Sequence, residues 1–161
     1  SASSTAPTMP ANYDYKRLIG WFKRVSAAIV AFKTWQTAGG GLAFRWSTVT
    51  LDVNQANQPT ITERLDAVKV PLNFETDALV RVSMVDSAST FLAAVYSPDE
   101  NISAMSTTAA PLVNILRDSG GTTAVAELVV RTDSNGQIAA QANSTLDNYY
   151  VVTIGFDWER R

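Results

Sequence analysis

The sequence contains no cysteine and no histidine among its 161 residues. Without cysteine, the chain can form no disulfide, thiolate nucleophile, zinc-thiolate site or iron-sulfur cluster. Without histidine, it lacks the commonest general base, the partner of most serine nucleophiles and the commonest metal ligand. We therefore expect a protein that is not an enzyme and holds no cofactor or metal, and whose role is to bind or to build.

Charge and long apolar runs are also scarce. The formal net charge is -2 and charged residues make up 17% of the chain. Nucleic-acid binding depends on a basic surface that neutralises phosphates, so we expect no nucleic-acid partner. No apolar run approaches the roughly 20 residues that a membrane helix needs, so we expect no membrane insertion. Hydrophobic residues make up 46% of the chain, which is enough for one packed core.

The first residues differ in composition from the rest. Residues 1–12 are mostly small and polar and include Pro7 and Pro10, which is typical of an extended linker or docking arm. We expect a single domain over residues 13–161.

The segment 15–35 fits two structures. Its apolar residues recur at helical spacing: Leu18, Phe22, Val25, Ile29 and Phe32. Basic residues would form the polar side of such a helix, which could lie on a membrane surface or in a partner's groove. Against this, Gly20 interrupts the run, β-favouring residues fill it, and Ser26-Ala27 could make a turn. We favour two strands.

The remaining patterns predict short strands. In residues 78–85, Val80, Val82 and Met84 form the apolar face of an alternating strand. Asn135-Gly136 predicts a tight hairpin that joins residues 125–131 to residues 137–143. Further strands are expected at 42–46, 65–72, 91–96, 112–116 and 149–156. About ten short strands with frequent turns predict an all-β fold, an antiparallel, jelly-roll-like β-sandwich.

Three groups of oxygen-bearing side chains are candidate chemical sites. Asp133-Ser134-Asn135-Gly136 resembles the start of a calcium loop, but the ligand spacing is too short and no glutamate follows, so a turn is the better interpretation. Glycosidases need paired carboxylates, and Asp99 with Glu100 and Asp157 with Glu159 are the nearest pairs. Their settings indicate solvated surface.

Aromatic residues could form a glycan site, because Trp and Tyr stack on sugar rings and present a polar edge. Trp35, Trp46 and Trp158 lie on or beside strand patterns, which favours the core or a subunit interface. Tyr96 adjoins the polar loop 97–101 and is expected to be exposed. The candidate binding residues are therefore Tyr96, Asp99 and Asn101.

Two regions, residues 10–46 and 112–161, carry short distinctive motifs. The motifs are Pro10-Ala11-Asn12-Tyr13, Lys16-Arg17-Leu18-Ile19-Gly20, Ile29-Val30-Ala31-Phe32, Ala126-Glu127-Leu128-Val129-Val130-Arg131-Thr132-Asp133, Asn135-Gly136-Gln137-Ile138, Thr153-Ile154-Gly155-Phe156-Asp157 and Arg160-Arg161. With these motifs, both ends of the chain resemble a β-rich module of tailed-bacteriophage fibre and spike proteins. The chain departs from the family at Phe156, since the family tends to place Trp directly after the glycine, and here Trp158 comes two residues later.

The resemblance implies a location and partners. It implies a virion protein at the particle surface or tail tip, a homotrimer in contact with other virion proteins, and attachment to a host surface glycan or protein. It also favours strands over a helix in residues 16–32. The alternative is a capsid-decorating, collar or adaptor protein of the same fold with no receptor-binding role.

Overall fold

The computed structural model describes residues 22–25, 28–87, 90–100, 102, 105, 115–118 and 122–158. These residues form twelve β-strands and no helix, so none of their elements is a helix long and apolar enough to cross a membrane. The chain divides into two compact units, Ser1–Val30 and Ala31–Arg161, which are described separately. The domain boundary expected after residue 12 lies outside the described residues.

In the first unit, β1 (Arg24–Val25) pairs antiparallel with β2 (Ala28–Ile29). The amide of Val30 donates to the carbonyl oxygen of Lys23 at 2.8 Å. Together with β3 (Phe32–Gln36) of the second unit, these strands confirm the strand interpretation for the described part of 15–35. Residues 15–21 and the expected turn at Ser26-Ala27 lie outside that part.

The second unit contains a six-stranded antiparallel sheet in the order β10-β7-β12-β4-β3. Strand β5 also pairs with β12, so two strands share one edge of β12. Strand β5 follows its first half, from Asn148 to Val152, and β4 follows its end, from Gly155 to Trp158. The strands not yet defined are β4 (Leu42–Trp46), β5 (Leu51–Ala56), β7 (Asp77–Asp86), β10 (Thr122–Arg131) and β12 (Asn148–Trp158).

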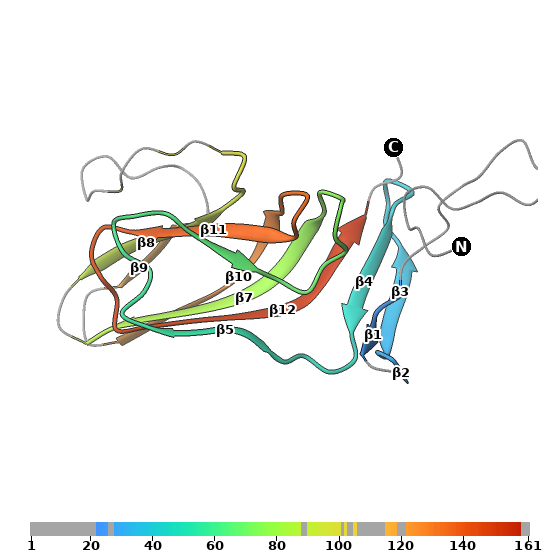
Figure 1. The fold of residues 1–161 in the computed structure, drawn as a ribbon, viewed down its shortest axis with the longest axis horizontal. Coiled ribbons are helices and arrows are strands. Elements are labelled where there is room, and N and C mark those ends of the chain that lie inside the picture. Colours follow the sequence, from blue (N-terminus) through green and yellow to red (C-terminus); the bar gives the residue numbers. More distant parts are fainter. Residues whose placement is uncertain are drawn as a thin grey trace, which may run out of the picture. The chain divides into compact units, whose positions relative to one another are not determined.

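A four-stranded antiparallel sheet, in the order β6-β11-β8-β9, packs against the first (Figure 1). Its strands are β6 (Arg64–Ala67), β8 (Phe91–Tyr96), β9 (Ile115–Asp118) and β11 (Gln137–Ala142). The expected strand at 65–72 is therefore shorter and begins one residue earlier. The β-sandwich expected from the strand patterns is confirmed.

Eight strands of the sandwich pair in a nested order. Strand β8 pairs with β9, β7 with β10, β6 with β11 and β5 with β12. The pairs alternate between the two sheets, and β7 with β12 and β8 with β11 join them within each sheet. The chain is thus wound as one long double strand, and most of its pairings join segments far apart in the sequence.

The core lies between the sheets. From β7, Val80, Val82 and Met84 are fully buried, which confirms the predicted apolar face. They pack in one cluster with alternate residues of β8, β11 and β12. At roughly 25 cal/mol for each Å² of apolar surface removed from water, such burial is the main source of stability in a chain without disulfides.

The hairpin expected at Asn135-Gly136 is wrong in its pairing. The turn is present, since the Gly136 amide donates to the Asp133 carbonyl oxygen at 3.1 Å and Gly136 has a φ of +70°. However, β10 pairs with β7 in the large sheet, whereas β11 lies in the small sheet. Ten residues of β10 are in register with β7, so the turn carries the chain from one sheet to the other.

Candidate functional site

The candidate binding residues Tyr96, Asp99 and Asn101 lie at the end of β8 and in the segment that follows it. Tyr96 is only 1% exposed, so the expectation that it is exposed is wrong. It packs with Met105 and Ile102 on the outer side of the small sheet, and its hydroxyl donates to Glu63 Oε2 at 2.7 Å. Burial, followed by this hydrogen bond, raises the pKa of Tyr96. Asp99 is exposed, and Asn101 lies outside the described residues.

The other oxygen-rich groups make structural contacts. The Asp133 carboxylate accepts from the amides of Asn135 at 3.0 Å and Gln137 at 2.7 Å, which stabilises the turn. Asp157 pairs with Arg45, and Glu159 lies outside the described residues. In the part of the chain that the structure describes, no three Asp or Glu side chains come together as a metal site would require.

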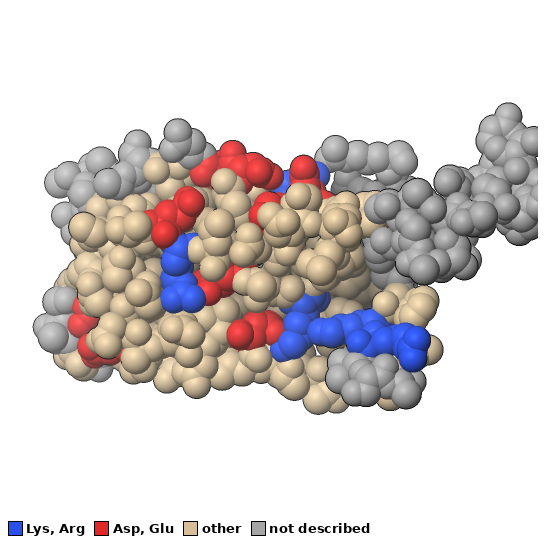
Figure 2. Space-filling model, viewed as in Figure 1, with Lys and Arg blue, Asp and Glu red and all other residues tan. Residues whose placement is uncertain are grey.

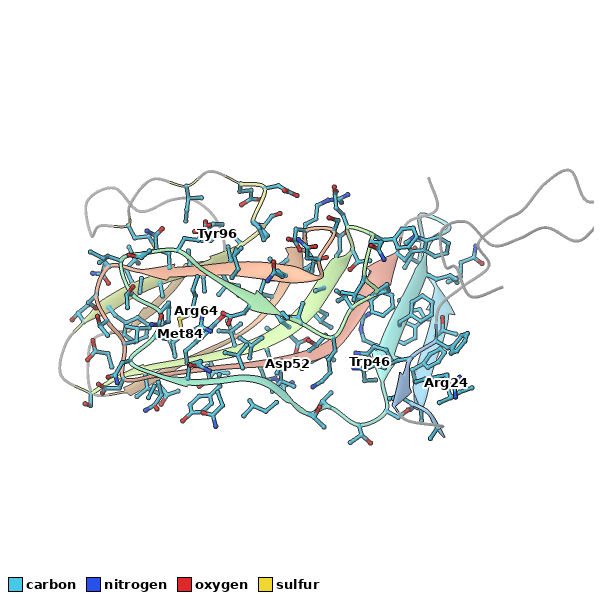
Figure 3. All side chains as sticks on the ribbon, viewed as in Figure 1. Arg24, Trp46, Asp52, Arg64, Met84 and Tyr96 are labelled. Atoms are coloured by element: carbon cyan, nitrogen blue, oxygen red, sulfur yellow. The ribbon has the colours of Figure 1, made fainter. Side chains whose placement is uncertain are left out.

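A charged pair lies at the inner side of β6. Arg64 Nε donates to Asp66 Oδ2 at 2.8 Å, and a second bond joins the same two side chains. The guanidinium carbon lies 5.8 Å from the ring centre of Tyr149, a buried residue of β12. Met84 lies directly across from Tyr149 in the register of β7 with β12, and Figure 3 labels Arg64 and Met84. Burial raises the pKa of Tyr149, and the negative charge of Asp66 adds to the effect. Arg64 and Asp66 satisfy each other, whereas the buried hydroxyl of Tyr149 has no hydrogen-bond partner in the described part of the chain.

A second polar group, formed by Asp52, Lys69 and Thr153, lies where the pairing between β5 and β12 ends. The Asp52 carboxylate accepts from the Thr153 amide at 2.6 Å and its hydroxyl at 2.5 Å, and it also pairs with Lys69. The Lys69 amide donates to the Thr153 hydroxyl at 3.0 Å. These bonds lie at the irregularity in the β5–β12 register, between Val151 and Val152. These bonds stabilise the point on the edge of β12 where its pairing with β5 ends.

Trp35 stands out among the aromatic residues of the second unit. It is 49% exposed on β3, the last strand on that side of the sheet. The guanidinium carbon of Arg45 lies 5.3 Å from its ring centre, a cation–π contact. Arg45 Nη1 donates to Asp157 Oδ1 at 2.6 Å and to the Phe44 carbonyl oxygen at 2.9 Å. The ring therefore rests on a side chain that is itself held in place.

Lys33 extends this group. It lies two residues before Trp35 on the same face of β3 and directly across from Arg45. Its side chain is exposed, and among the described residues no carboxylate forms an ion pair with it. We call Lys33, Trp35 and Arg45 the hairpin platform. These residues and Asp157 supply two cations and one carboxylate, which leaves one positive charge beside a half-exposed indole.

The other two predicted tryptophans behave differently. Trp46 is partly buried, its ring lies 6.0 Å from that of Phe156, and its indole N–H donates to the Lys69 carbonyl oxygen at 3.2 Å. Phe156 in turn stacks on Phe44 at 4.7 Å. Trp158 is also partly buried. The core position expected for Trp35 is wrong, while contact with another subunit stays a prediction.

The outer face of the large sheet is the other unusual surface. Leu51, Val125 and Val129 are 47%, 61% and 57% exposed. Their strand registers place all three on the face opposite the core. The ion pair of Arg81 with Glu127, at 3.2 Å, lies among them. On the face drawn in Figure 2, charged side chains form short separate groups within a surface that other residues dominate.

No sequence pattern marked either surface directly. Alternation placed Trp35 and Val125 on strands without indicating which side the core would cover. Comparison of the chain with protein-family models, curated proteins and solved structures found no match. The function is therefore inferred from the residues themselves.

Proposed function

We propose that this chain is a virion structural protein, a fibre or spike module that attaches to a glycan on the host cell surface. The nested order of β5 to β12 supports this, because it is the strand order expected of a jelly roll, an architecture common among viral capsid and lectin domains. Fold alone does not determine function. The resemblance of both chain ends to phage fibre and spike modules adds the virion setting.

One observation carries the attachment role, namely the half-exposed Trp35 on a hairpin fixed by Arg45 and Asp157. Exposed aromatics held in a rigid position are typical contact residues in binding sites, because little entropy is lost when they bind. The Tyr96, Asp99 and Asn101 loop is less suitable, since the ring of Tyr96 is covered.

The proposed partners are two further copies of the chain and other virion proteins. The exposed Leu51, Val125 and Val129 on the outer sheet face support contact with such neighbours. Measurement of mass in solution tests the trimer. We expect three times the 17.4 kDa of one chain. A monomer at micromolar concentration would contradict the trimer.

Attachment is tested by binding of the fluorescently tagged protein to cells and to a glycan array. We expect saturable binding to cells of a susceptible host, and loss of binding after the surface polysaccharide is removed enzymatically. Failure to bind any such host would refute the attachment role.

A capsid-decorating, collar or adaptor role is the second candidate. The same outer sheet face favours it, because three exposed aliphatic side chains on one face suit permanent contact better than a reversible receptor site. An electron-microscopy map of the particle separates the two roles. A domain enclosed by other virion proteins, with Trp35 covered, would favour the structural role.

A further inference from the structure

We infer that the hairpin platform is a subsite for an acidic sugar, a pyranose ring that carries a carboxylate. This inference rests on the proposed glycan attachment and names the class of sugar and the residues that contact it. Three properties of the platform support it: a half-exposed aromatic ring, a cation that pairs with no carboxylate among the described residues, and a fixed position of the ring.

The aromatic surface is Trp35. With 49% of its surface exposed, its ring offers area on which the C–H face of a pyranose can pack. Ala43 lies directly across from Trp35 and is 1% exposed, so the indole covers a small residue and not a large competing side chain. Among the described residues, no strand of the sheet pairs along the other edge of β3.

The charge comes from Lys33. Arg45 is already engaged, because its Nη1 also donates to the Phe156 carbonyl oxygen at 3.3 Å besides its bonds to Asp157 and Phe44. Lys33 has no recorded carboxylate contact in the described part of the chain, and its ammonium group can donate three hydrogen bonds. A carboxylate on a sugar stacked against Trp35 would meet this cation. A neutral sugar would leave it unused.

The geometry is fixed by Arg45, which acts as a positioning residue. Its guanidinium lies 5.3 Å from the Trp35 ring centre, and its own position is set by a carboxylate of β12 and two backbone carbonyl oxygens. The indole therefore has a partner on one side before any ligand arrives. Less side-chain entropy is lost on binding, which favours a weak but specific contact that a multimer would strengthen.

The experiment uses the whole chain and two matched probes. These are a tetrasaccharide of galacturonic acid and the same tetrasaccharide with its carboxyl groups converted to methyl esters, which removes the charge and keeps the ring. Binding is followed by the indole N–H resonance of Trp35, which is assigned from its absence in Trp35→Phe. Three further variants are Trp35→Ala, Lys33→Gln and, as the control, Gln36→Ala, which lies on the other face of β3.

We expect the acidic tetrasaccharide to shift the Trp35 resonance and to bind about tenfold tighter than its ester, the change expected when one charge-assisted hydrogen bond is lost. Lys33→Gln should remove this preference, Trp35→Ala should weaken binding of both probes at least about tenfold, and Gln36→Ala should bind as the wild type does. Thermal unfolding of each variant shows that it is folded, and Lys33→Gln tests the inference even if Trp35→Ala does not fold.

An unshifted Trp35 resonance, or equal binding of the two probes, would overturn the acidic-sugar subsite. Cell binding separates this from the proposed function. If the wild type binds host cells and folded Trp35→Ala binds them equally well, the subsite is wrong and attachment stands. If the wild type does not bind cells, the attachment role itself is refuted.

Discussion

Replacing Gly155 with alanine would test how closely β4 approaches β12. A Cβ atom on Gly155 would overlap the carbonyl oxygen of Phe44 and would lie 2.7 Å from Arg45 Cδ and 2.9 Å from Arg45 Cα. Carbon atoms in contact ordinarily lie about 3.5–4.0 Å apart, so the shortfall is about 0.6 Å or more. Two of the three atoms belong to the backbone of β4, which cannot rotate away.

The cost follows from this overlap. Overpacked sites typically lose about 1–3 kcal/mol, and a backbone clash belongs at the upper end, so we expect Gly155→Ala to lower the free energy of unfolding by about 3 kcal/mol. For a chain of this size each kcal/mol lowers Tm by about 2–4 °C, so Tm should fall by about 6–12 °C. Circular dichroism during heating and during titration with urea measures both quantities.

Gly39→Ala is the matched control. No atom lies within 4 Å of a Cβ placed on Gly39, and its φ is not positive. We expect a change of no more than about 1 kcal/mol in either direction, because the substitution acts mainly on the unfolded chain. If Gly155→Ala unfolded at the same temperature as Gly39→Ala, the close approach of β4 to β12 would be wrong, and with it the support of the hairpin platform.

Three further predictions concern single side chains. The Asp147 carboxylate accepts from the amide and hydroxyl of Ser87 at 2.8 and 2.5 Å, and these bonds lower the pKa of Asp147 below its ordinary 3.8. The ionised Asp147 carboxylate therefore stabilises the fold above pH 3.8, and this stabilisation is lost as the pH falls through the folded-state pKa of Asp147. In an NMR titration Ser87→Ala should raise this pKa, and an unchanged value would contradict the contact. Burial raises the pKa of Tyr149. The neutral phenol therefore contributes fully to the free energy of unfolding below the unfolded-state pKa near 10, and this contribution is lost at higher pH. Tyr149→Phe should move the midpoint of alkaline unfolding to higher pH while Tyr150→Phe does not, and equal midpoints would count against this. Phe156→Trp should lower stability by about 1–3 kcal/mol in urea, because the residue is 1% exposed and a larger ring overfills its site. Wild-type stability would show that the site has room.

The strand positions were largely predictable, because a strand with one buried face alternates apolar and polar residues along the sequence. Residues 91–96 were predicted with the bounds that the structure has, and Val80, Val82 and Met84 face the core as expected. The pairing of strands was not predictable from turns. Turn chemistry at Asn135-Gly136 specifies where the chain reverses, but the edge that a strand then joins depends on the whole sheet.

The candidate site was less predictable, because exposure depends on distant segments. Tyr96 is the last residue of a strand and precedes a polar loop, which indicated exposure. Ile102 and Met105 pack beside it, and no local pattern marked them as its partners. Trp35 shows the opposite case, since its strand position indicated the core or a subunit interface, and in the structure it is half exposed on β3, the last strand of the sheet. In both cases tertiary packing decided what periodicity could not.

The position of β12 has a consequence for how the chain folds. It is the last of the described strands in sequence, yet it lies within the large sheet between β7 on one edge and β5 and β4 on the other. During synthesis, β7 can pair with β10, but the edges that face β12 stay open until Asn148–Trp158 has emerged. Assembly must therefore be late and cooperative, and pairings of such long range are slow to form.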